Sequence, residues 1–243
     1  MKSLATLRET RQENQTLPIS EIFHSLQGEG PNAGDPATFL RLAFCNLKCT
    51  WCDSKYTWDW ERFNPESEVQ RLSLTEVERE IEGWGCSHIV VTGGEPLLQQ
   101  TALVPLLSRL DDSGYFIEVE TNGTIVPSSP LLDTVDQWNV SPKLSNSGNA
   151  GTSRDKPDAI RIFRRSERAY FKFVMARPYD IEEVKAFREE YGVERERIVL
   201  MPEARTPRDL GERGVWVAEL CRKYGFLFTT RLQIQLWEGR RGF

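Results

Sequence analysis

Residues 38–52 read TFLRLAFCNLKCTWC, an apolar run that leads directly into three cysteines. The run 38–44 has the length and the aromatic, apolar and β-branched content of a strand. Cys45, Cys49 and Cys52 follow it with C-x3-C-x2-C spacing. Three thiolates are enough to hold three irons of a four-iron cluster and to leave the fourth iron open for chemistry. The stretch therefore predicts a reactive metal centre where a strand ends.

Zinc and disulfides are the two other uses of such cysteines. A structural zinc site normally takes four protein ligands, often as two pairs. Here Cys86 and Cys221 are isolated, and His24 and His88 lie far apart in the sequence. Disulfides are disfavoured because the chain has five cysteines in 243 residues and we expect no secretory leader. The spacing favours the cluster and leaves zinc as the weaker alternative.

The composition is that of a soluble globular protein, with 39% hydrophobic and 28% charged residues and no apolar run that could cross a bilayer. A net charge of −5 argues against a nucleic-acid partner. Cysteines that must stay reduced indicate the cytoplasm. We expect a loose polar tail over residues 1–16 and, because no Pro/Gly-rich linker divides the rest, a single domain over 17–243.

Strand-like and helix-like stretches alternate along the chain, which is typical of βα units over a parallel sheet. Six units fall short of the eight that close a full barrel, so the predicted fold class is α/β, a partial, open βα barrel. The expected strands are 38–44, 88–92, 116–120, 137–141, 170–175 and 197–201. One further strand is expected over 226–236. The segment 54–72 has no clear period and is expected to replace a regular first crossover helix.

The expected helices carry apolar residues at helical spacing. The first has a capping box of Thr75 and Glu78, and its apolar face is Val77, Ile81 and Trp84. The others are a helix with Leu103, Leu106, Leu107 and Leu110 on one face, and two helices over Ile181–Tyr191 and Pro207–Tyr224, the first with Val184 and Phe187 facing inward.

Polar or Gly/Pro-rich turns follow five of the expected strands. In α/β proteins the ligands gather at the carboxyl ends of the strands. The turns begin at Cys45, at Gly93-Gly94-Glu95-Pro96, at Thr121-Asn122-Gly123, at Ser141-Pro142-Lys143 and at Met201-Pro202-Glu203. Any one of them alone also fits a tight turn without function. Five in phase with the cysteines predict a site at this edge of the sheet.

With the cysteine triplet after one strand and GGEP after the next, the sequence resembles the radical S-adenosylmethionine (SAM) superfamily. The resemblance implies a [4Fe-4S] cluster on Cys45, Cys49 and Cys52, whose fourth iron is chelated by SAM. It also implies that Gly93, Gly94 and Glu95 line the methionine moiety of SAM, with Ser141 and Lys143 near its carboxylate or ribose. Glycines allow close approach of the backbone, and a lysine suits an anion.

A narrower resemblance runs through the chain from Ile19 onward, to the 7-carboxy-7-deazaguanine synthases. It rests on ISEIF at 19–23, SLQGEG at 25–30, FLRL at 39–42, CTWCD at 49–53, YTW at 56–58, VTGGEPLLQ at 91–99, ETNG at 120–123, VSPKLS at 140–145, FKFV at 171–174, MPE at 201–203 and QIQLW at 233–237. The ordered set is far more specific than a lone GGEP.

This resemblance implies a lyase that contracts 6-carboxy-5,6,7,8-tetrahydropterin to 7-carboxy-7-deazaguanine with loss of ammonia, on the route to queuosine and related 7-deazapurines. SAM serves as a reusable source of the 5′-deoxyadenosyl radical, so no residue is assigned a catalytic role. The resemblance further implies Mg²⁺ against the substrate, an electron donor such as flavodoxin or ferredoxin, and a homodimer.

The positions that match the family's pterin site are Gln27, Glu29, Arg41, Thr92 and Glu120, with Phe243 at the chain end. Carboxylates such as Glu29 and Glu120 suit the N–H donors of the pterin edge, and Arg41 suits its carboxylate. Arg41 lies within an apolar strand, where an unpaired charge is costly, so we expect an anionic partner. The alternative is that strand alternation points it at solvent.

Three features depart from the family pattern or extend it. Ser54 stands where a threonine usually touches Mg²⁺, and it keeps the oxygen but loses the β-branched stiffness. Phe44 precedes Cys45 where glycine is expected. The end of the chain, 240–243, is expected to fold back toward the substrate, with a frayed tail as the alternative.

Two other functions remain open from the sequence. One is a radical SAM activase that acts on a glycine of a protein partner, which shares the cysteine spacing but does not explain Gln27, Glu29 and Arg41. The other is a zinc-stabilised binding module without catalysis.

Overall fold

One nine-stranded sheet organises the computed structural model, which describes residues 15–243. β1 (Thr16–Leu26) pairs antiparallel with β2 (Pro36–Leu42) and with β3 (Gln70–Ser73). From β2 onward all neighbours are parallel, through β4 (His88–Gly93), β5 (Phe116–Thr121), β6 (Gln137–Val140), β7 (Ala169–Met175), β8 (Ile198–Pro202) and β9 (Leu227–Phe228). The order runs from β3 at one edge to β9 at the other, so the sheet is not closed and the predicted open βα barrel is confirmed.

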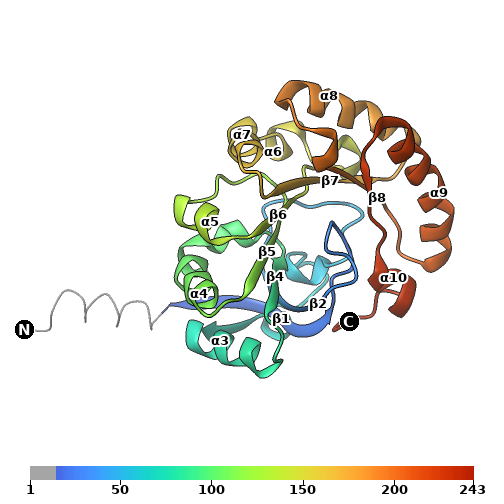
Figure 1. Ribbon diagram of the computed structural model, residues 1–243. Helices are drawn as coiled ribbons and strands as arrows, with labels where there is room; N and C mark the ends of the chain where they lie inside the picture. The colour runs from blue at the N-terminus through green and yellow to red at the C-terminus, as the bar shows by residue number, and fades with distance from the viewer. Residues whose placement is uncertain (1–14) are drawn as a thin grey trace, which may run out of the picture.

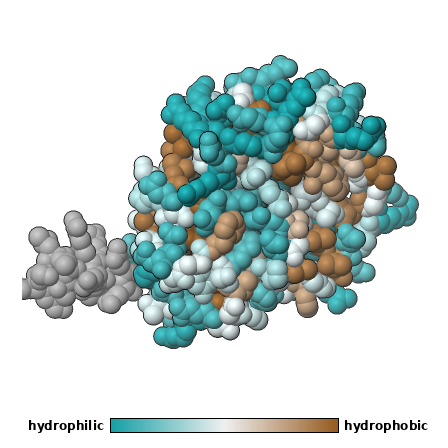
Figure 2. All heavy atoms as spheres, viewed as in Figure 1, coloured by the Kyte–Doolittle hydropathy of each residue, from teal (hydrophilic) through white to brown (hydrophobic). Residues whose placement is uncertain are grey.

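Helices form an arc outside the curved sheet (Figure 1). The longer ones are α3 (Leu74–Gly83), α4 (Gln100–Asp112), α5 (Ser129–Thr134), α7 (Pro157–Arg165), α8 (Ile181–Tyr191) and α9 (Pro207–Tyr224). Short helices are α2 (Pro65–Glu68), α6 (Gly151–Arg154) and α10 (Leu232–Trp237), with 3-10 turns η1 (Lys55–Thr57), η2 (Pro96–Gln99), η3 (Ser145–Ser147), η4 (Pro178–Asp180) and η5 (Arg195–Arg197). In Figure 2 the rim of the molecule is largely hydrophilic, and hydrophobic side chains show mainly inside that rim.

Strand alternation separates the hydrophobic core from the inside of the barrel. On β5, Ile117 and Val119 are buried in the core cluster that includes the predicted α4 stripe. Glu118 and Glu120, the alternate residues, bond to side chains inside the barrel. Successive residues of a strand point to opposite faces, so the strands that build the core also carry polar groups into the interior.

The six predicted strands are confirmed to within two residues at each end, and α8 and α9 have the predicted bounds. β1 and β3 were not predicted. β1 begins at Thr16, the last residue of the predicted tail, and residues 1–14 of that tail lie outside the described part of the chain.

Three predictions around the first crossover are corrected. The capping box of α3 is formed by Ser73 and Glu76, two residues earlier than predicted, with Glu76 N donating to Ser73 Oγ at 3.3 Å. Trp84 is half-exposed and stacks on His24 rather than joining the core, because α3 ends before it. The segment 54–72 contains η1, α2 and most of edge strand β3, and α3 then supplies the crossover helix.

The predicted strand over 226–236 is wrong. Only Leu227–Phe228 pairs with β8, and the chain then turns into α10. Contacts with the segment after β1 decide this: Gly30 N donates to Thr229 Oγ1 at 2.8 Å, and Leu232 N donates to Gly28 O at 3.0 Å. Tertiary contacts here override the alternating pattern.

Candidate active site

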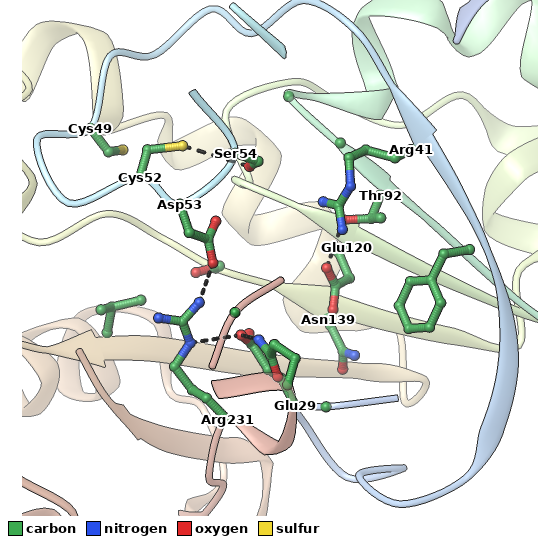
Figure 3. Close-up of a pocket in the computed structure, with 18 of the residues that line it drawn as sticks. Glu29, Arg41, Cys49, Cys52, Asp53, Ser54, Thr92, Glu120, Asn139 and Arg231 are labelled. Atoms are coloured by element: carbon green, nitrogen blue, oxygen red, sulfur yellow. Dashed lines mark hydrogen bonds and ion pairs between the residues drawn. The ribbon is translucent and has the colours of Figure 1, made fainter. Parts of the chain in front are cut away.

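The three predicted cluster cysteines open onto one cavity of about 270 Å³. They lie in the loop that follows β2, at the carboxyl edge of the parallel strands, as Figure 3 shows for Cys49 and Cys52. No group of three Cys, His, Asp or Glu side chains within residues 15–243 converges on a single ion position. Three thiols around one cavity can bind a cluster in which each thiolate holds a different iron.

Each thiol receives an N–H group. Leu47 N donates to Cys45 Sγ at 3.4 Å, Asn149 Nδ2 to Cys49 Sγ at 3.2 Å, and Trp58 Nε1 to Cys52 Sγ at 3.4 Å. Burial raises the pKa of Cys45 to about 12, and bound iron would stabilise the thiolate against this effect. The donors are the kind that stabilise thiolates around iron–sulfur clusters.

The predicted GGEP loop lies directly against the cysteine loop. A Cβ on Gly93, whose φ is +131°, would come within 2.1 Å of Leu42 O, and one on Gly94 within 2.0 Å of Phe44 O. Both glycines line the cavity. Only glycine permits this approach, and it leaves backbone groups at the wall, where a ligand's ammonium group could bind.

Glu95 lies behind the cavity wall rather than in it, unlike the role that the resemblance implied. Its carboxylate is fully buried and accepts hydrogen bonds from Thr121 Oγ1 at 2.8 Å, Asn122 N at 2.7 Å and Leu97 N at 3.0 Å. It ties the loop after β4 to the loop after β5. We therefore assign Glu95 a supporting role for the wall.

Phe44 has a left-handed backbone, with φ of +74°. This conformation is costly for a bulky residue and free for glycine, which explains why glycine is expected at this position. Its ring packs edge-on against Trp60 at 5.7 Å, and its carbonyl accepts a hydrogen bond from Glu95 N at 2.8 Å. The residue therefore joins the cysteine loop to the glycine loop under strain.

Ser141 and Lys143 lie on the cavity wall as predicted. Lys143 Nζ donates to Ser141 Oγ at 2.8 Å and lies 5.6 Å from the centre of the Trp51 ring. Trp51 stands between two of the cysteines, so a cation is held beside the cluster loop.

Glu29 is buried on the opposite wall among cations (Figure 3). It accepts from Lys172 Nζ at 2.6 Å, Arg231 Nε at 3.0 Å and Gln233 Nε2 at 2.7 Å. Burial alone would raise its pKa, but the charges of Lys172 and Arg231 hold the pKa well below its usual range. Arg231 also binds Asp53, so it links Glu29 to the residue beside Ser54.

Glu120, Thr92 and Gln27 form a third group inside the barrel. Thr92 Oγ1 donates to Glu120 Oε2 at 2.7 Å, while Gln27 Nε2 and Lys172 Nζ lie 3.5 Å and 3.7 Å from Glu120 Oε1. Gln27 Nε2 is closer to the buried Glu118, at 2.5 Å. Among the partners that residues 15–243 provide, Oε1 of Glu120 thus has only long contacts and remains available to a ligand.

Arg41 has the expected anionic partner, which is Glu21 of β1 at 3.1 Å. Its side chain is one-fifth exposed and lines the cavity, so the solvent-facing alternative is not supported. The end of the chain folds back as expected, since residues 239–243 line the same cavity. Phe243 itself is half-exposed and packs against Trp237 at 5.8 Å.

Several residues of the site were missed, among them Glu21, Lys172, Arg231 and Asn139, which all line the cavity. Lys172 carried the same signal as Arg41, a charge inside an apolar strand. Arg231 was hidden in the segment wrongly predicted as a strand. Ser54, which was predicted, is nearly buried with Oγ 3.7 Å from Cys52 Sγ.

The open βα barrel, the cysteine triplet and the glycine loop at one edge define a radical SAM enzyme. The family model of the Radical SAM superfamily matches residues 40–138. The 7-carboxy-7-deazaguanine synthase of Pyrobaculum aerophilum is 41% identical over 92% of this chain and 96% of its own, and that of Halobacterium salinarum is 36% identical over 93% and 92%. The crystal structure of QueE from Escherichia coli superposes with a TM-score of 0.70 at 27% identity, over 95% of this chain and 99% of that one.

This chain belongs to the 7-carboxy-7-deazaguanine synthase family. Its cofactors are accordingly a [4Fe-4S] cluster and SAM, and it is a lyase. Family membership sets aside the activase and the zinc-binding module. Within residues 15–243, no helix has the length and apolar character needed to span a bilayer.

Proposed function

We propose that this chain contracts 6-carboxy-5,6,7,8-tetrahydropterin to 7-carboxy-7-deazaguanine, with loss of ammonia, inside the cavity described above. The observation that carries the proposal is that the cysteine loop, Arg41, Glu29 and Glu120 all face one cavity. A ligand held by the charged groups would therefore lie next to the cluster. When bound, the cluster and SAM supply radical hydrogen abstraction.

The chain's own residues hold the cofactors. Cys45, Cys49 and Cys52 would bind three irons, with the N–H donors around them stabilising the thiolates. The backbone of Gly93 and Gly94 would receive the methionine end of SAM. Lys143, fixed by Ser141, would pair with an anionic group of SAM.

Glu120 is the stronger candidate for the pterin N–H edge. Glu29 already accepts three hydrogen bonds of ordinary length, and a carboxylate offers about four acceptor sites. In the described part of the chain, Glu120 accepts one such bond, from Thr92, and a longer one from Gln27. Arg41 would take the substrate's carboxylate, and Phe243, with the rest of the C-terminal segment, would cover the bound molecule.

Ser54 would supply the one protein oxygen to Mg²⁺. Mg²⁺ usually keeps several waters and needs few protein ligands, which agrees with a single hydroxyl beside the substrate. We expect Ser54→Thr to keep or improve the response of turnover to added Mg²⁺. No response in either protein would remove the metal from this account.

Several further properties belong to the proposal. We propose that residues 17–243 form one domain, that the enzyme is a cytoplasmic homodimer, and that flavodoxin or ferredoxin reduces the cluster. No nucleic acid or membrane takes part.

The test is an anaerobic incubation of the reconstituted protein with SAM, a reductant and the carboxytetrahydropterin, with the product identified by mass. We expect 7-carboxy-7-deazaguanine from the wild type. Cys49→Ala, the control, should stay folded but lose its cluster absorbance and SAM cleavage. A wild type that holds four irons and cleaves SAM but makes no such product would contradict the proposal.

A further inference from the structure

Glu21 of β1 is the meeting point of three side chains from distant parts of the chain. Its Oε2 accepts a hydrogen bond from Arg41 Nε at 3.1 Å and from Tyr56 OH at 2.8 Å. Its Oε1 accepts one from Arg241 Nε at 2.9 Å. The carboxylate is 16% exposed, so these bonds form in a largely dry environment where they are strong.

On the inner side, Glu21 fixes the orientation of Arg41. The two residues face each other across the β1–β2 pair, and the guanidinium also lies over the Phe23 ring at 5.5 Å. Glu21 uses only Nε, and the two terminal nitrogens of Arg41 have no hydrogen-bond partner within residues 15–243. These nitrogens form the flat pair that binds a carboxylate with two parallel bonds.

On the outer side, Glu21 holds the C-terminal segment 239–243. Arg241 has a second bond from its NH2 nitrogen to Glu68 at 2.9 Å, and its guanidinium lies 3.7 Å above the Tyr56 ring. Figure 1 shows the C-terminus beside β1 and β2, which agrees with these contacts. Because residues 239–243 line the cavity, this anchor keeps the segment across the site.

We propose that Glu21 is a positioning residue for the reaction, which orients the arginine for the substrate's carboxylate and also holds the C-terminal segment over the bound molecule. The inference rests on the proposed role of Arg41. Each oxygen of the carboxylate serves one of the two tasks, with Oε2 on Arg41 and Oε1 on Arg241. Closure of the site and presentation of the cation therefore depend on one side chain.

A simple charge argument and the positioning role predict opposite changes in KM when Glu21 is removed. If Glu21 acted only through its charge, it would repel the substrate's carboxylate, and removing it would lower KM. If it positions Arg41 and the segment, removing it raises KM. The direction in which KM changes therefore distinguishes the charge explanation from the positioning role.

The experiment uses the anaerobic holoenzyme and compares Glu21→Ala, Glu21→Gln and Glu68→Gln. Glu68 touches Arg241 but is not bonded to Arg41. The measurements are KM and kcat for the carboxytetrahydropterin, and the rate at which carboxypeptidase A releases Phe243, followed by intact mass. Glu78→Gln is the matched control, since it breaks an ion pair of similar length, 2.9 Å to Arg109, on the outer helices.

We expect Glu21→Ala to raise KM about ten- to a hundredfold, the range of a charge-assisted hydrogen bond, with a smaller change in kcat. Glu21→Gln should recover part of the loss, because its amide oxygen still accepts from Arg41 Nε. Phe243 should be released faster from all three variants, with a smaller rise in KM for Glu68→Gln. Glu78→Gln should match the wild type in both measurements.

A KM that falls or stays unchanged in Glu21→Ala, or Phe243 release at the wild-type rate, would overturn the inference. Cluster absorbance and SAM cleavage report whether each variant is folded. If Glu21→Ala does not fold, Arg241→Gln, at the half-exposed end of the chain, tests the anchor of the C-terminal segment instead. A wild type that makes no product would refute the proposed reaction instead. In that case Phe243 release and equilibrium dialysis of the pterin still decide the role of Glu21.

Discussion

At the scale of single residues, one backbone angle explains why glycine is expected at position 44, where this chain has phenylalanine. Its φ of +74° is strained for any residue with a side chain, and the residue sits between the cysteine loop and Gly94. The edge-on contact with Trp60 offsets part of that cost. The strain is thus stored next to the first cluster ligand.

Phe44 provides a prediction about stability, in which a glycine substitution costs less than an alanine substitution, the reverse of the usual order. Both Phe44→Gly and Phe44→Ala lose the contact with Trp60, but only glycine relieves the left-handed backbone. We expect the glycine variant to be more stable than the alanine variant by about 1 kcal/mol. Denaturant unfolding of the cluster-free proteins measures this. An alanine variant of equal or greater stability would contradict the strain.

At the scale of elements, β5 carries stability on one face and binding on the other. Val119 packs in the core, and Glu120, the next residue, lines the cavity. Substitutions at these two neighbouring positions should therefore affect different properties, stability at Val119 and ligand binding at Glu120.

The pair gives a matched prediction. Val119→Ala should cost about 2 kcal/mol of unfolding free energy through lost burial and an incompletely filled cavity, with little change in KM. Glu120→Gln should raise KM for the pterin with little effect on SAM binding, because its proposed partner is the substrate. Unfolding curves, KM for the pterin and equilibrium binding of SAM, measured on both variants, check these two predictions. Equal loss of pterin and SAM affinity in Glu120→Gln would move this residue to the cofactor side.

The elements that could be predicted from sequence are those that bury an apolar run. β2, β4, β7 and β8 have such runs, and predicted site turns follow the ends of β2, β4 and β8. β1 was missed because Ser20, Glu21 and His24 interrupt its apolar residues. α10 was predicted as part of a strand because residues 226–236 alternate aromatic, Thr and apolar side chains, and its contact with Gly28 joins residues about two hundred positions apart. The cationic partners of Glu29 were missed because they lie 143 and 202 positions away in the sequence. Glu21, the partner of Arg41, was missed together with β1.

At the scale of the whole molecule, the open sheet is bridged by side chains. The segment after β1 meets the segment after β9 through Glu29 with Arg231 and Gln233, and through Gly30 with Thr229. Lys172 adds a contact from β7. This buried group holds the two ends of the barrel together.

The same group predicts how stability depends on pH. The pKa of Glu29 is lowered in the folded protein from its ordinary value of 4.5, so its stabilising effect is present above pH 4.5 and is lost as the pH falls below it. Glu29→Gln removes the carboxylate that Lys172 and Arg231 share, leaving Arg231 with Asp53 and Lys172 with its 3.7 Å contact to Glu120, and should cost about 3 kcal/mol at pH 7.

Unfolding free energies of the cluster-free wild type and of Glu29→Gln, measured from pH 7 to pH 3.5, test this. The difference between the two proteins should shrink by up to about 1.4 kcal/mol for each pH unit below 4.5. A difference that is the same at pH 7 and at pH 3.5 would show that Glu29 is not held ionised by its neighbours.

The bond between Arg231 and Asp53 has a consequence for how the protein is made. These residues are 178 positions apart, and the three cysteines come just before Asp53 in the sequence. A ribosome therefore exposes all three cluster ligands long before it makes the arginine and the C-terminal segment that enclose them. The contact between Arg231 and Asp53 can therefore form only after the whole cysteine loop has been synthesised.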